Sequence, residues 1–271
     1  MNMAASASEF AIPVLDGALP HALVPLRDPL RRPPQFDFAA AWRHFRTFKQ
    51  DKEQTNVVFC VFDSLPWVGI DRAAERFLAT GRGREVYASE PFLPDILDDH
   101  AALRRLPMGS LAHDYCDFME REGLTAACLV RETEAMNGGR PRHNDQVQWY
   151  IDRQRDVHDL LHILTRYGRD ALGEQCVLAF VFNQRPSWGH IFIAYAGAMV
   201  TRRRNGTHAP VLRAAREAQR MGRACPRIAE QSIRALMALP TEVVREKFSI
   251  RPVRFYDEVH RIWRAAGIEP G

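Results

Sequence analysis

The sequence predicts an all-α protein, a single helical domain with a metal-binding helix hairpin, preceded by an irregular N-terminal tail. Three observations support this prediction. Apolar residues recur at helical spacing over most of the chain after residue 36, and capping residues or glycines bracket several of these segments. Prolines interrupt the segment before residue 37 repeatedly. We therefore assign residues 1–36 to the tail and residues 37–271 to the helical domain, which is large enough to bury its own core.

The tail contains proline at six positions and shows no helical period: Pro13, Pro20, Pro25, Pro29, Pro33 and Pro34. It has no basic stretch before an apolar run, which argues against a secretory signal and an amphipathic transit peptide. No uninterrupted apolar run in the chain approaches the ~20 residues of a membrane-spanning helix. We expect a protein that lies in solution or on a membrane surface, with a tail that is dispensable for catalysis.

Helices are expected, in chain order, at residues 37–50, 110–123, 144–167, 209–222, 226–240, 241–248 and 255–267. Asp37 and Ser110 are the expected N-caps of the first two, and Gly123 and Gly168 are expected to end the second and the third. The run "VVFCVF" at residues 57–62 fits a helix or a strand equally well, because it is rich in β-branched and aromatic residues.

Composition excludes several classes of protein. The net charge is only +4 and nearly all of the positive charge is arginine, so we do not predict binding to nucleic acid. The 5 cysteines are odd in number and contain no C-x-x-C pair. This pattern is typical of reduced thiols in a cytosolic protein, and it argues against a disulfide framework or a thiolate metal site.

The stretch "HDLLHILTRYGRDALGE" is the most informative part of the sequence. His158 and His162 are one helical turn apart, and Asp159 lies on the same edge of the helix. Asp170 can cap the following helix, which places Glu174 in its first turn. A helix hairpin would bring Glu174 back towards the histidines. Two imidazoles and two carboxylates suit zinc or iron(II), although a hydrogen-bonded histidine pair on a polar face has the same spacing.

Other residues allow both a functional and a structural interpretation. Arg155 precedes His158 by three residues and could bind a substrate carboxylate or face solvent. His113 with Asp114, and His190, could act as acid–base groups or play structural roles. The apolar segments at residues 177–182 and 191–200, with small residues at 196–198, could line a channel or form ordinary core helices. The following Arg202, Arg203 and Arg204 suit an anionic membrane surface or a solvated face.

The histidine motif resembles the signature of the ubiquinone (coenzyme Q) biosynthesis family built on the fourth yeast coenzyme-Q protein, H-D-x-x-H followed after eleven residues by Glu. His158, Asp159, His162 and Glu174 match it position by position. Three further segments resemble the family: "KQDKEQTNVVFCVFDSL", "LPMGSLAHDYCDFME" and "APVLRAAREAQRMGRACPRIAEQSIRALMALPTEVVREKFSI". The resemblance covers roughly residues 40 to 250 and is most specific at the metal motif.

The resemblance implies a helical protein that binds a divalent metal, most often Zn²⁺, with Fe²⁺ as the alternative, through those four residues. It implies removal of the C1 carboxylate from a polyprenylated hydroxybenzoate, with oxidation at the same carbon. It also implies a peripheral membrane protein that associates with other ubiquinone-biosynthesis enzymes, compatible with a homo-oligomer. The missing presequence favours a bacterial member on the cytoplasmic side of the inner membrane.

Two other functions remain open at this point. A metal-dependent phosphohydrolase could use the His158–Asp159 doublet with His113 or His143, but that reading leaves His162 and Glu174 without a role. A non-enzymatic organiser could bind a prenylated intermediate and hold partner enzymes together. The segments "NQRPSWGH" and "TRRRNGTH" do not align with the family, so its resemblance says nothing about the pocket for the substrate ring.

Overall fold

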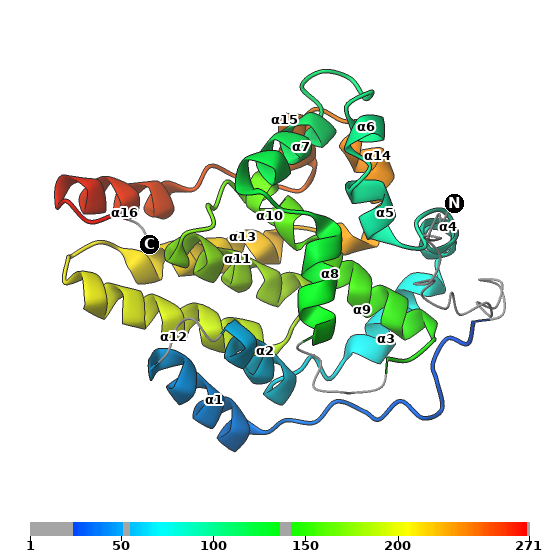
Figure 1. Ribbon diagram of the computed structural model, residues 1–271, viewed down its shortest axis with the longest axis horizontal. Coiled ribbons are helices and arrows are strands. Elements are labelled where there is room, and N and C mark those ends of the chain that lie inside the picture. The colour runs from blue at the N-terminus through cyan, green and yellow to red at the C-terminus, as the bar shows by residue number, and fades with distance from the viewer. Residues whose placement is uncertain (1–23, 51–54, 136–141, 270–271) are drawn as a thin grey trace, which may run out of the picture.

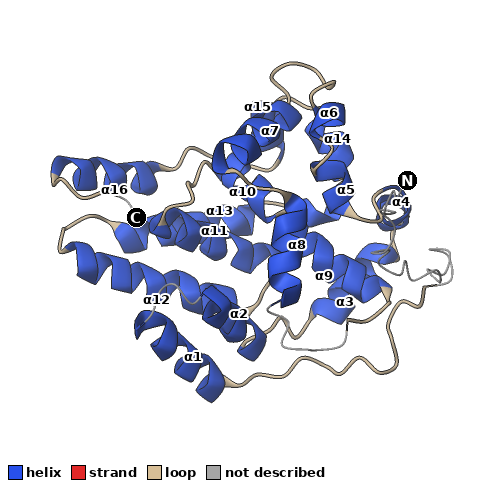
Figure 2. Cartoon of the chain, viewed as in Figure 1, coloured by secondary structure: helices blue, strands red, loops and turns tan. Residues whose placement is uncertain are grey.

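The computed structural model describes residues 24–50, 55–135 and 142–269 (Figure 1). Within these ranges the chain is helical and contains no β-strand, apart from an isolated bridge between Ser110 and Pro240 (Figure 2). The prediction of an all-α fold is confirmed. Across the same ranges, none of the helices combines the length and the hydropathy that a membrane crossing requires.

The helices follow one another along the chain with short connections. In order they are α1 Phe38–Gln50, α2 Thr55–Ser64, α3 Ile70–Leu78, α4 Gly81–Ser89, α5 Leu93–Leu97, α6 His100–Leu103, α7 Leu111–Glu122, α8 Ala126–Ala135, α9 Gln146–Asp156, α10 His158–Thr165, α11 Ala171–Gln184, α12 Trp188–Asn205, α13 Val211–Ala224, the 3₁₀ turn η2 Ile228–Glu230, α14 Ile233–Met237, α15 Thr241–Lys247 and α16 Arg254–Ala265.

Helices α11, α12 and α13 pack against one another at the centre of the molecule (Figure 1). α1 and α2 cover one side of α12, and α16 packs on α13. The largest apolar core joins these central helices to α7, α10 and α15, and two smaller clusters lie under α1–α2 and between α3 and α9. Helix α11 is buried on nearly all sides, so it is the element that positions its neighbours.

Most of the helices that the sequence predicts are present. In α1 the backbone N–H of Ala40 donates to Asp37 Oδ1 at 2.7 Å, as expected of an N-cap. α7 begins directly after Ser110, whose side chain makes no capping hydrogen bond, and ends before Gly123, which takes the left-handed conformation (φ 65°) that ends a helix. The ambiguous run at residues 57–62 lies in helix α2. α13, α15 and α16 fall within the predicted segments, with small shifts at their ends.

The prediction of one helix over residues 144–167 is wrong, because the segment breaks at Val157 into α9 and α10. The two halves bury different faces: α9 packs on α3, α5 and α8, whereas α10 packs on α7, α11 and α15. A straight helix could not make both sets of contacts. α10 also ends before Gly168, since Arg166 takes the left-handed conformation (φ 63°).

The predicted helix at residues 226–240 is also broken, by a buried ion pair between Glu90 and Arg153. Each residue is 1% exposed, and Arg153 Nη2 lies 2.7 Å from Glu90 Oε2. Glu90 accepts hydrogen bonds from Ser232 Oγ and from the N–H of Ile233, while Arg153 Nε donates to the carbonyl of Ala229. These bonds hold the backbone between η2 and α14 in a non-helical path.

The described part of the tail, residues 24–36, contains no helix or strand, but it is docked on the start of α9. Arg31 donates to both oxygens of Asp145 at 2.8 and 2.7 Å, and the carbonyls of Pro25 and Leu26 accept from the first amides of α9. The Asp145 side chain is fully buried. Removal of this segment would break these bonds to α9. Both the boundary at residue 36 and a tail that is dispensable for catalysis stay predictions.

The ion pair in the core leads to a stability prediction. We expect Glu90→Gln to lower the free energy of unfolding by about 3–5 kcal/mol, because it leaves the Arg153 charge buried without its counter-ion. Urea denaturation followed by circular dichroism measures the change. Glu85→Gln, on the exposed face of α4, is the matched control and should change stability by less than about 0.5 kcal/mol. Equal stability of the two variants would contradict the assigned role.

Candidate metal centre

Three of the predicted donor residues converge at the start of α10 and α11. His158 and His162 project from α10 with their Nε2 atoms 3.3 Å apart. Glu174, in the first turn of α11, brings Oε2 to 3.6 Å from His158 Nε2 and Oε1 to 3.5 Å from His162 Nε2. The three donor atoms lie within 4.8 Å of one another. The hairpin that the spacing predicts therefore brings these side chains together.

The turn between α10 and α11 sets the position of Glu174. Asp170 caps α11 by accepting from the N–H groups of Leu172 and Gly173, and the Tyr256 hydroxyl donates to its other oxygen. A Cβ on Gly173 would lie 1.9 Å from the carbonyl oxygen of Gly168, so only glycine fits at this crossing. The residue before Glu174 is therefore a glycine because a larger side chain would collide with the backbone of Gly168.

A backbone hydrogen bond orients the buried imidazole. His162 Nδ1 lies 3.0 Å from the carbonyl oxygen of Tyr167, which can only accept, so Nδ1 carries the proton. In the neutral ring the lone pair of Nε2 then faces His158 and Glu174, and protonation of Nε2 lets it donate to Glu174 when no ion is bound. The ring of Phe118 stacks on His162 at 6.0 Å between centroids and excludes water from that side. This arrangement is typical of a histidine that ligates a metal.

Electrostatics also favour a cation at this point. Burial would raise the pKa of Glu174, but the hydrogen bonds and charges of His158 and His162 outweigh it and hold the pKa well below its usual range. Burial would lower the pKa of His162, yet the bond to Glu174 outweighs it and the pKa is raised. The carboxylate is therefore ionised at neutral pH and supplies the negative charge that a divalent ion needs.

The separations of the donors fit a tetrahedral ion. Ligand atoms about 2.0–2.2 Å from a tetrahedral zinc ion lie roughly 3.4 Å from each other, close to the 3.3, 3.5 and 3.6 Å observed here. The His162 side chain is 1% exposed, whereas those of His158 and Glu174 are 29% and 38% exposed. Three ligands with one open side are typical of a catalytic site, because structural zinc sites are closed by four.

Asp159, the fourth predicted ligand, lies outside this group of donor atoms. Its charge acts on the buried phenol of Tyr115, whose pKa is raised first by burial and then by Asp159. The Tyr115 hydroxyl is buried and has no hydrogen-bond partner among the described residues. The role of Asp159 as a ligand stays a prediction.

Arg155 already has carboxylate partners. Its Nε donates to Asp156 Oδ1 at 2.7 Å, and its Nη1 lies 3.4 Å from Asp152 Oδ1. Because α9 ends before His158, Arg155 and the ligands do not share one continuous helix. Its predicted contact with a substrate carboxylate stays a prediction, and it would require these two pairs to rearrange.

The remaining candidate histidines have separate roles. His113 Nε2 lies 3.0 Å from the carbonyl of Leu106, and His143 Nδ1 lies 2.8 Å from Asp28 Oδ2. Neither belongs to the donor group of α10 and α11. Neither His113 nor His143 therefore joins the donors of α10, as the metal site of a phosphohydrolase would require.

The apolar stretch of α12 is a packing surface against α11. A Cβ on Gly197 would lie 3.0–3.2 Å from the side chain of Gln175, and Ala198 is fully buried. The small residues allow close approach of the two helices. They support the interpretation as core helices, and a channel for isoprene units stays a prediction.

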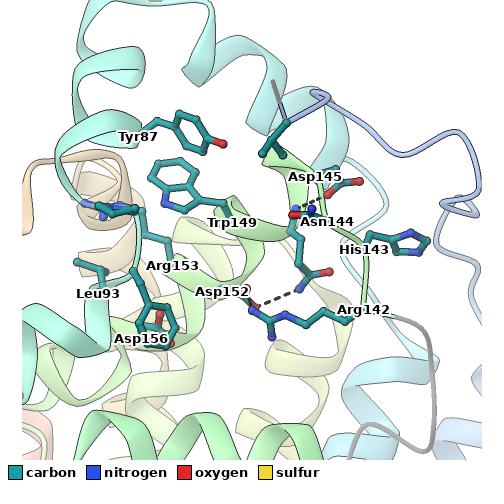
Figure 3. A pocket seen from close by; sticks show the side chains of 14 residues that line it. Tyr87, Leu93, Arg142, His143, Asn144, Asp145, Trp149, Asp152, Arg153 and Asp156 are labelled. Carbon is teal, nitrogen blue, oxygen red and sulfur yellow. Dashed lines mark hydrogen bonds and ion pairs between the residues drawn. The ribbon is translucent and has the colours of Figure 1, made fainter. Parts of the chain in front are cut away.

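Two further polar sites lie elsewhere. A cleft of about 170 Å³ beside α9 is lined by Tyr87, Trp149 and a set of charged residues (Figure 3). Its charges are internally paired: Arg142 Nη2 contacts Asp152 Oδ2 at 2.5 Å, and Gln148 donates to the other oxygen. Burial raises the pKa of Asp156, at the cleft floor, to about 6.

His100, Cys116 and Glu120 form a second cluster of potential metal donors. Glu120 Oε2 already accepts from Arg104 Nη2 at 2.9 Å. Burial is the main cause that raises the pKa of the Cys116 thiol, which disfavours the thiolate that a metal needs. This cluster is the weaker candidate, and it provides a matched control for the first.

Comparison with known proteins agrees with the resemblance. Residues 47–253, which include the whole donor group, match the family model described as "Coenzyme Q (ubiquinone) biosynthesis protein Coq4". Two Culex quinquefasciatus proteins, named ubiquinone biosynthesis protein COQ4 homolog 2 and homolog 1, mitochondrial, are each 27% identical over 122 residues, or 45% of this chain. A Pyricularia oryzae protein named ubiquinone biosynthesis protein COQ4, mitochondrial, is 28% identical over 115 residues, or 42% of this chain.

The match to this chain spans about half or less of the length of each of these relatives. It covers 52% and 43% of the two Culex proteins and 35% of the Pyricularia protein. A crystal structure of a candidate ubiquinone biosynthesis protein from Nostoc punctiforme PCC 73102 superposes with a TM-score of 0.53 at 17% identity. It covers 80% of this chain and 100% of its own, which shows a likeness of fold.

The donor group leads to a prediction on metal binding. We expect His158→Ala, His162→Ala and Glu174→Ala each to abolish stoichiometric binding of Zn²⁺ while helicity and a cooperative melt are kept, because the core does not depend on the ion. Asp159→Asn should weaken binding only by about 10- to 100-fold, the range for groups outside the ligand set. Glu120→Ala should change nothing. Elemental analysis and circular dichroism on the same samples measure both properties, and unfolding of the three variants would indicate a structural site.

Proposed function

The chain belongs to the Coq4 family of coenzyme Q (ubiquinone) biosynthesis proteins, and we propose that it removes the C1 carboxylate of a polyprenylated hydroxybenzoate precursor. In the simple form of the proposal a proton replaces the lost CO₂ at C1; in the fuller form a hydroxyl replaces it, and an external two-electron oxidant accepts the electrons. The observation that supports it is the half-open group of His158, His162 and Glu174, which suits a substrate-accessible divalent ion.

The residues have distinct roles in this proposal. His158, His162 and Glu174 would hold the ion, with Zn²⁺ favoured by the two imidazoles and Fe²⁺ as the alternative. A bound ion would supply Lewis acidity towards a ring oxygen, and so stabilise the negative charge that loss of CO₂ leaves on the ring. The Tyr167 carbonyl fixes the tautomer of His162, and Phe118 keeps water from its buried face.

The polyprenyl substrate and the surface of the protein both suit a membrane. α1 carries exposed aromatic side chains, Phe38 at 65% and Trp42 at 55%, and it lies along α12, where Trp42 contacts Phe192. The last turn of α12 carries Arg202, Arg203 and Arg204. Aromatic rings and arginines together suit the headgroup region of an anionic bilayer.

We propose that the protein binds the surface of an anionic membrane, which by the expectation from the sequence is the cytoplasmic face of a bacterial inner membrane. Its proposed partners there are other ubiquinone-biosynthesis enzymes and other copies of the chain. A non-enzymatic organiser would use the same surface, so the two functions differ only in whether the isolated protein turns over substrate.

The third prediction concerns the decarboxylation reaction. Purified protein loaded with Zn²⁺ or Fe²⁺ should release labelled CO₂ from a short-chain prenyl hydroxybenzoate labelled at the C1 carboxylate, under air. Glu174→Ala should lower the rate by at least about 100-fold, because removal of a ligand removes the ion's stabilisation of charge. Glu120→Ala is the control and should keep the full rate. If neither metal form releases CO₂ while partner enzymes still bind, the organiser function is favoured.

A fourth prediction concerns the membrane. Arg202→Glu, Arg203→Glu and Arg204→Glu together should weaken binding to phosphatidylserine-containing liposomes by at least tenfold, since each basic residue near the surface contributes about 1 kcal/mol. Release of CO₂ from the soluble short-chain substrate should be unchanged. The matched control reverses Arg216, Arg220 and Arg223, three exposed arginines of α13. Equal liposome binding by the two triple variants would contradict the proposed surface.

A further inference from the structure

Tyr256, in the first turn of α16, lies against the turn that joins α10 to α11. α16 begins at Arg254, so it lies beyond residues 47–253, the part of the chain that matches the family model. Tyr256, Val259 and Trp263 are its buried residues, and the helix packs on α13. The packing of α16 therefore brings a phenol from outside the hairpin to the turn between the metal-holding helices.

The Tyr256 hydroxyl makes two hydrogen bonds to this turn. The N–H of Gly168 donates to it at 2.9 Å, and the hydroxyl donates its own proton to Asp170 Oδ2. Burial is the main cause that raises the pKa of Tyr256, and the hydrogen bond to Asp170 adds to it. The phenol therefore stays protonated and can donate at neutral pH.

The bond from Gly168 acts on the orientation of His162. The N–H of Gly168 and the carbonyl of Tyr167 belong to one peptide group, which is planar. This carbonyl accepts from His162 Nδ1 at 3.0 Å. Because the N–H is held by the Tyr256 hydroxyl, the direction of the carbonyl that orients the imidazole is also held.

The bond to Asp170 acts on the position of Glu174. Asp170 Oδ1 accepts from two N–H groups in the first turn of α11, and the Asp170 carbonyl accepts from the N–H of Glu174 at 3.0 Å. His260, one turn further along α16, places Nε2 3.4 Å from Asp170 Oδ1. Burial would raise the pKa of Asp170, but His260 and Tyr256 outweigh it and the pKa is lowered. The cap is therefore a carboxylate at neutral pH, held from α16.

The hydroxyl can approach this closely because residue 168 is a glycine. A Cβ on Gly168 would lie 2.8 Å from Tyr256 Oη and 3.0 Å from Asp170 Oδ2, which is too close for atoms that are not bonded. Gly168 does not have a positive φ. The space for the hydroxyl, and not the backbone conformation, is therefore the reason for a glycine at this position.

Resting on the proposed function, we infer that Tyr256 is a positioning residue that holds His162 and Glu174 in register for one divalent ion. Its single hydroxyl ties the peptide that orients the imidazole of α10 to the cap of the helix that carries the carboxylate. His162 Nε2 and Glu174 Oε1 lie 3.5 Å apart, close to the separation of two ligands of a tetrahedral ion. Without the hydroxyl the two ligands would be ordered only when the ion binds, which weakens binding.

The test measures Zn²⁺ binding to the full chain by calorimetric titration, after a chelator has removed bound metal. Tyr256→Phe keeps the ring and removes the hydroxyl, so it should weaken binding by about 10- to 100-fold, the range for groups that support a ligand. Tyr150→Phe is the matched control, because it removes another buried hydroxyl that donates to a carboxylate, Glu230, in the cluster between α3 and α9. It should leave the affinity for Zn²⁺ unchanged.

Two further measurements separate positioning from a general loss of stability. Both variants should lower the Tm of the metal-free protein, because each loses a buried hydrogen bond. Only Tyr256→Phe should change the visible absorption of bound Co²⁺, which reports the number and geometry of its ligands. Natural affinity for Zn²⁺ in Tyr256→Phe, or an equal loss of affinity in both variants, would overturn the inference.

Gly168→Ala tests the same link while the phenol is kept. Alone it should weaken Zn²⁺ binding, because the methyl group displaces the Tyr256 hydroxyl. In the Tyr256→Phe background it should weaken binding less, because the closest oxygen is absent. Natural affinity in Gly168→Ala alone would count against the inference, as would losses that simply add.

Failure of the inference differs from failure of the proposed function. Binding of Zn²⁺ that depends on Tyr256, without any release of CO₂, would refute decarboxylation and leave the positioning role intact. Natural Zn²⁺ affinity together with release of CO₂ in Tyr256→Phe would refute the positioning role and leave decarboxylation intact. A natural sequence that binds neither Zn²⁺ nor Co²⁺ would refute both.

Discussion

The buried ion pair between Glu90 and Arg153 is the interaction on which the arrangement of the site depends. It joins the end of α4 to α9 and holds the backbone between η2 and α14 through bonds to both partners. Because α9 is held on this side of the molecule, the chain must break at Val157 before α10 can pack on α7, α11 and α15. The first histidine of the donor group stands at that break. An ion pair that is not part of the donor group thus sets the direction in which α10 starts.

The sequence was sufficient to predict the fold class and those helices whose start or stop signals are local. α1 and α7 have an N-cap or a glycine stop at the predicted positions, and their apolar stripes are local properties. The break at Val157 and the interruption between η2 and α14 were not predictable. Both depend on Glu90 and Arg153, which lie 63 positions apart in the chain, and no local pattern marks such a pair.

The candidate site was likewise predictable only in part. His158, His162 and Glu174 were predictable because helical spacing and the Asp170 cap place them locally. The pairing of Arg155 and the hydrogen bond from Arg185 to His190 depend on how α9, α11 and α12 pack.

The steric fit at Gly173 has a consequence for protein engineering. Residues 158–174 contain the three converging donors, the carbonyl that selects the tautomer and the glycine crossing that sets their spacing. The segment is therefore close to a transferable cassette, because it contains the contacts that set the spacing of its three donors. Two side chains outside the segment complete it. The Tyr256 hydroxyl on α16 donates to Asp170, and the Phe118 ring on α7 covers His162. A host scaffold for this hairpin needs an aromatic residue on each of two flanking helices, and it does not need a copy of the whole domain.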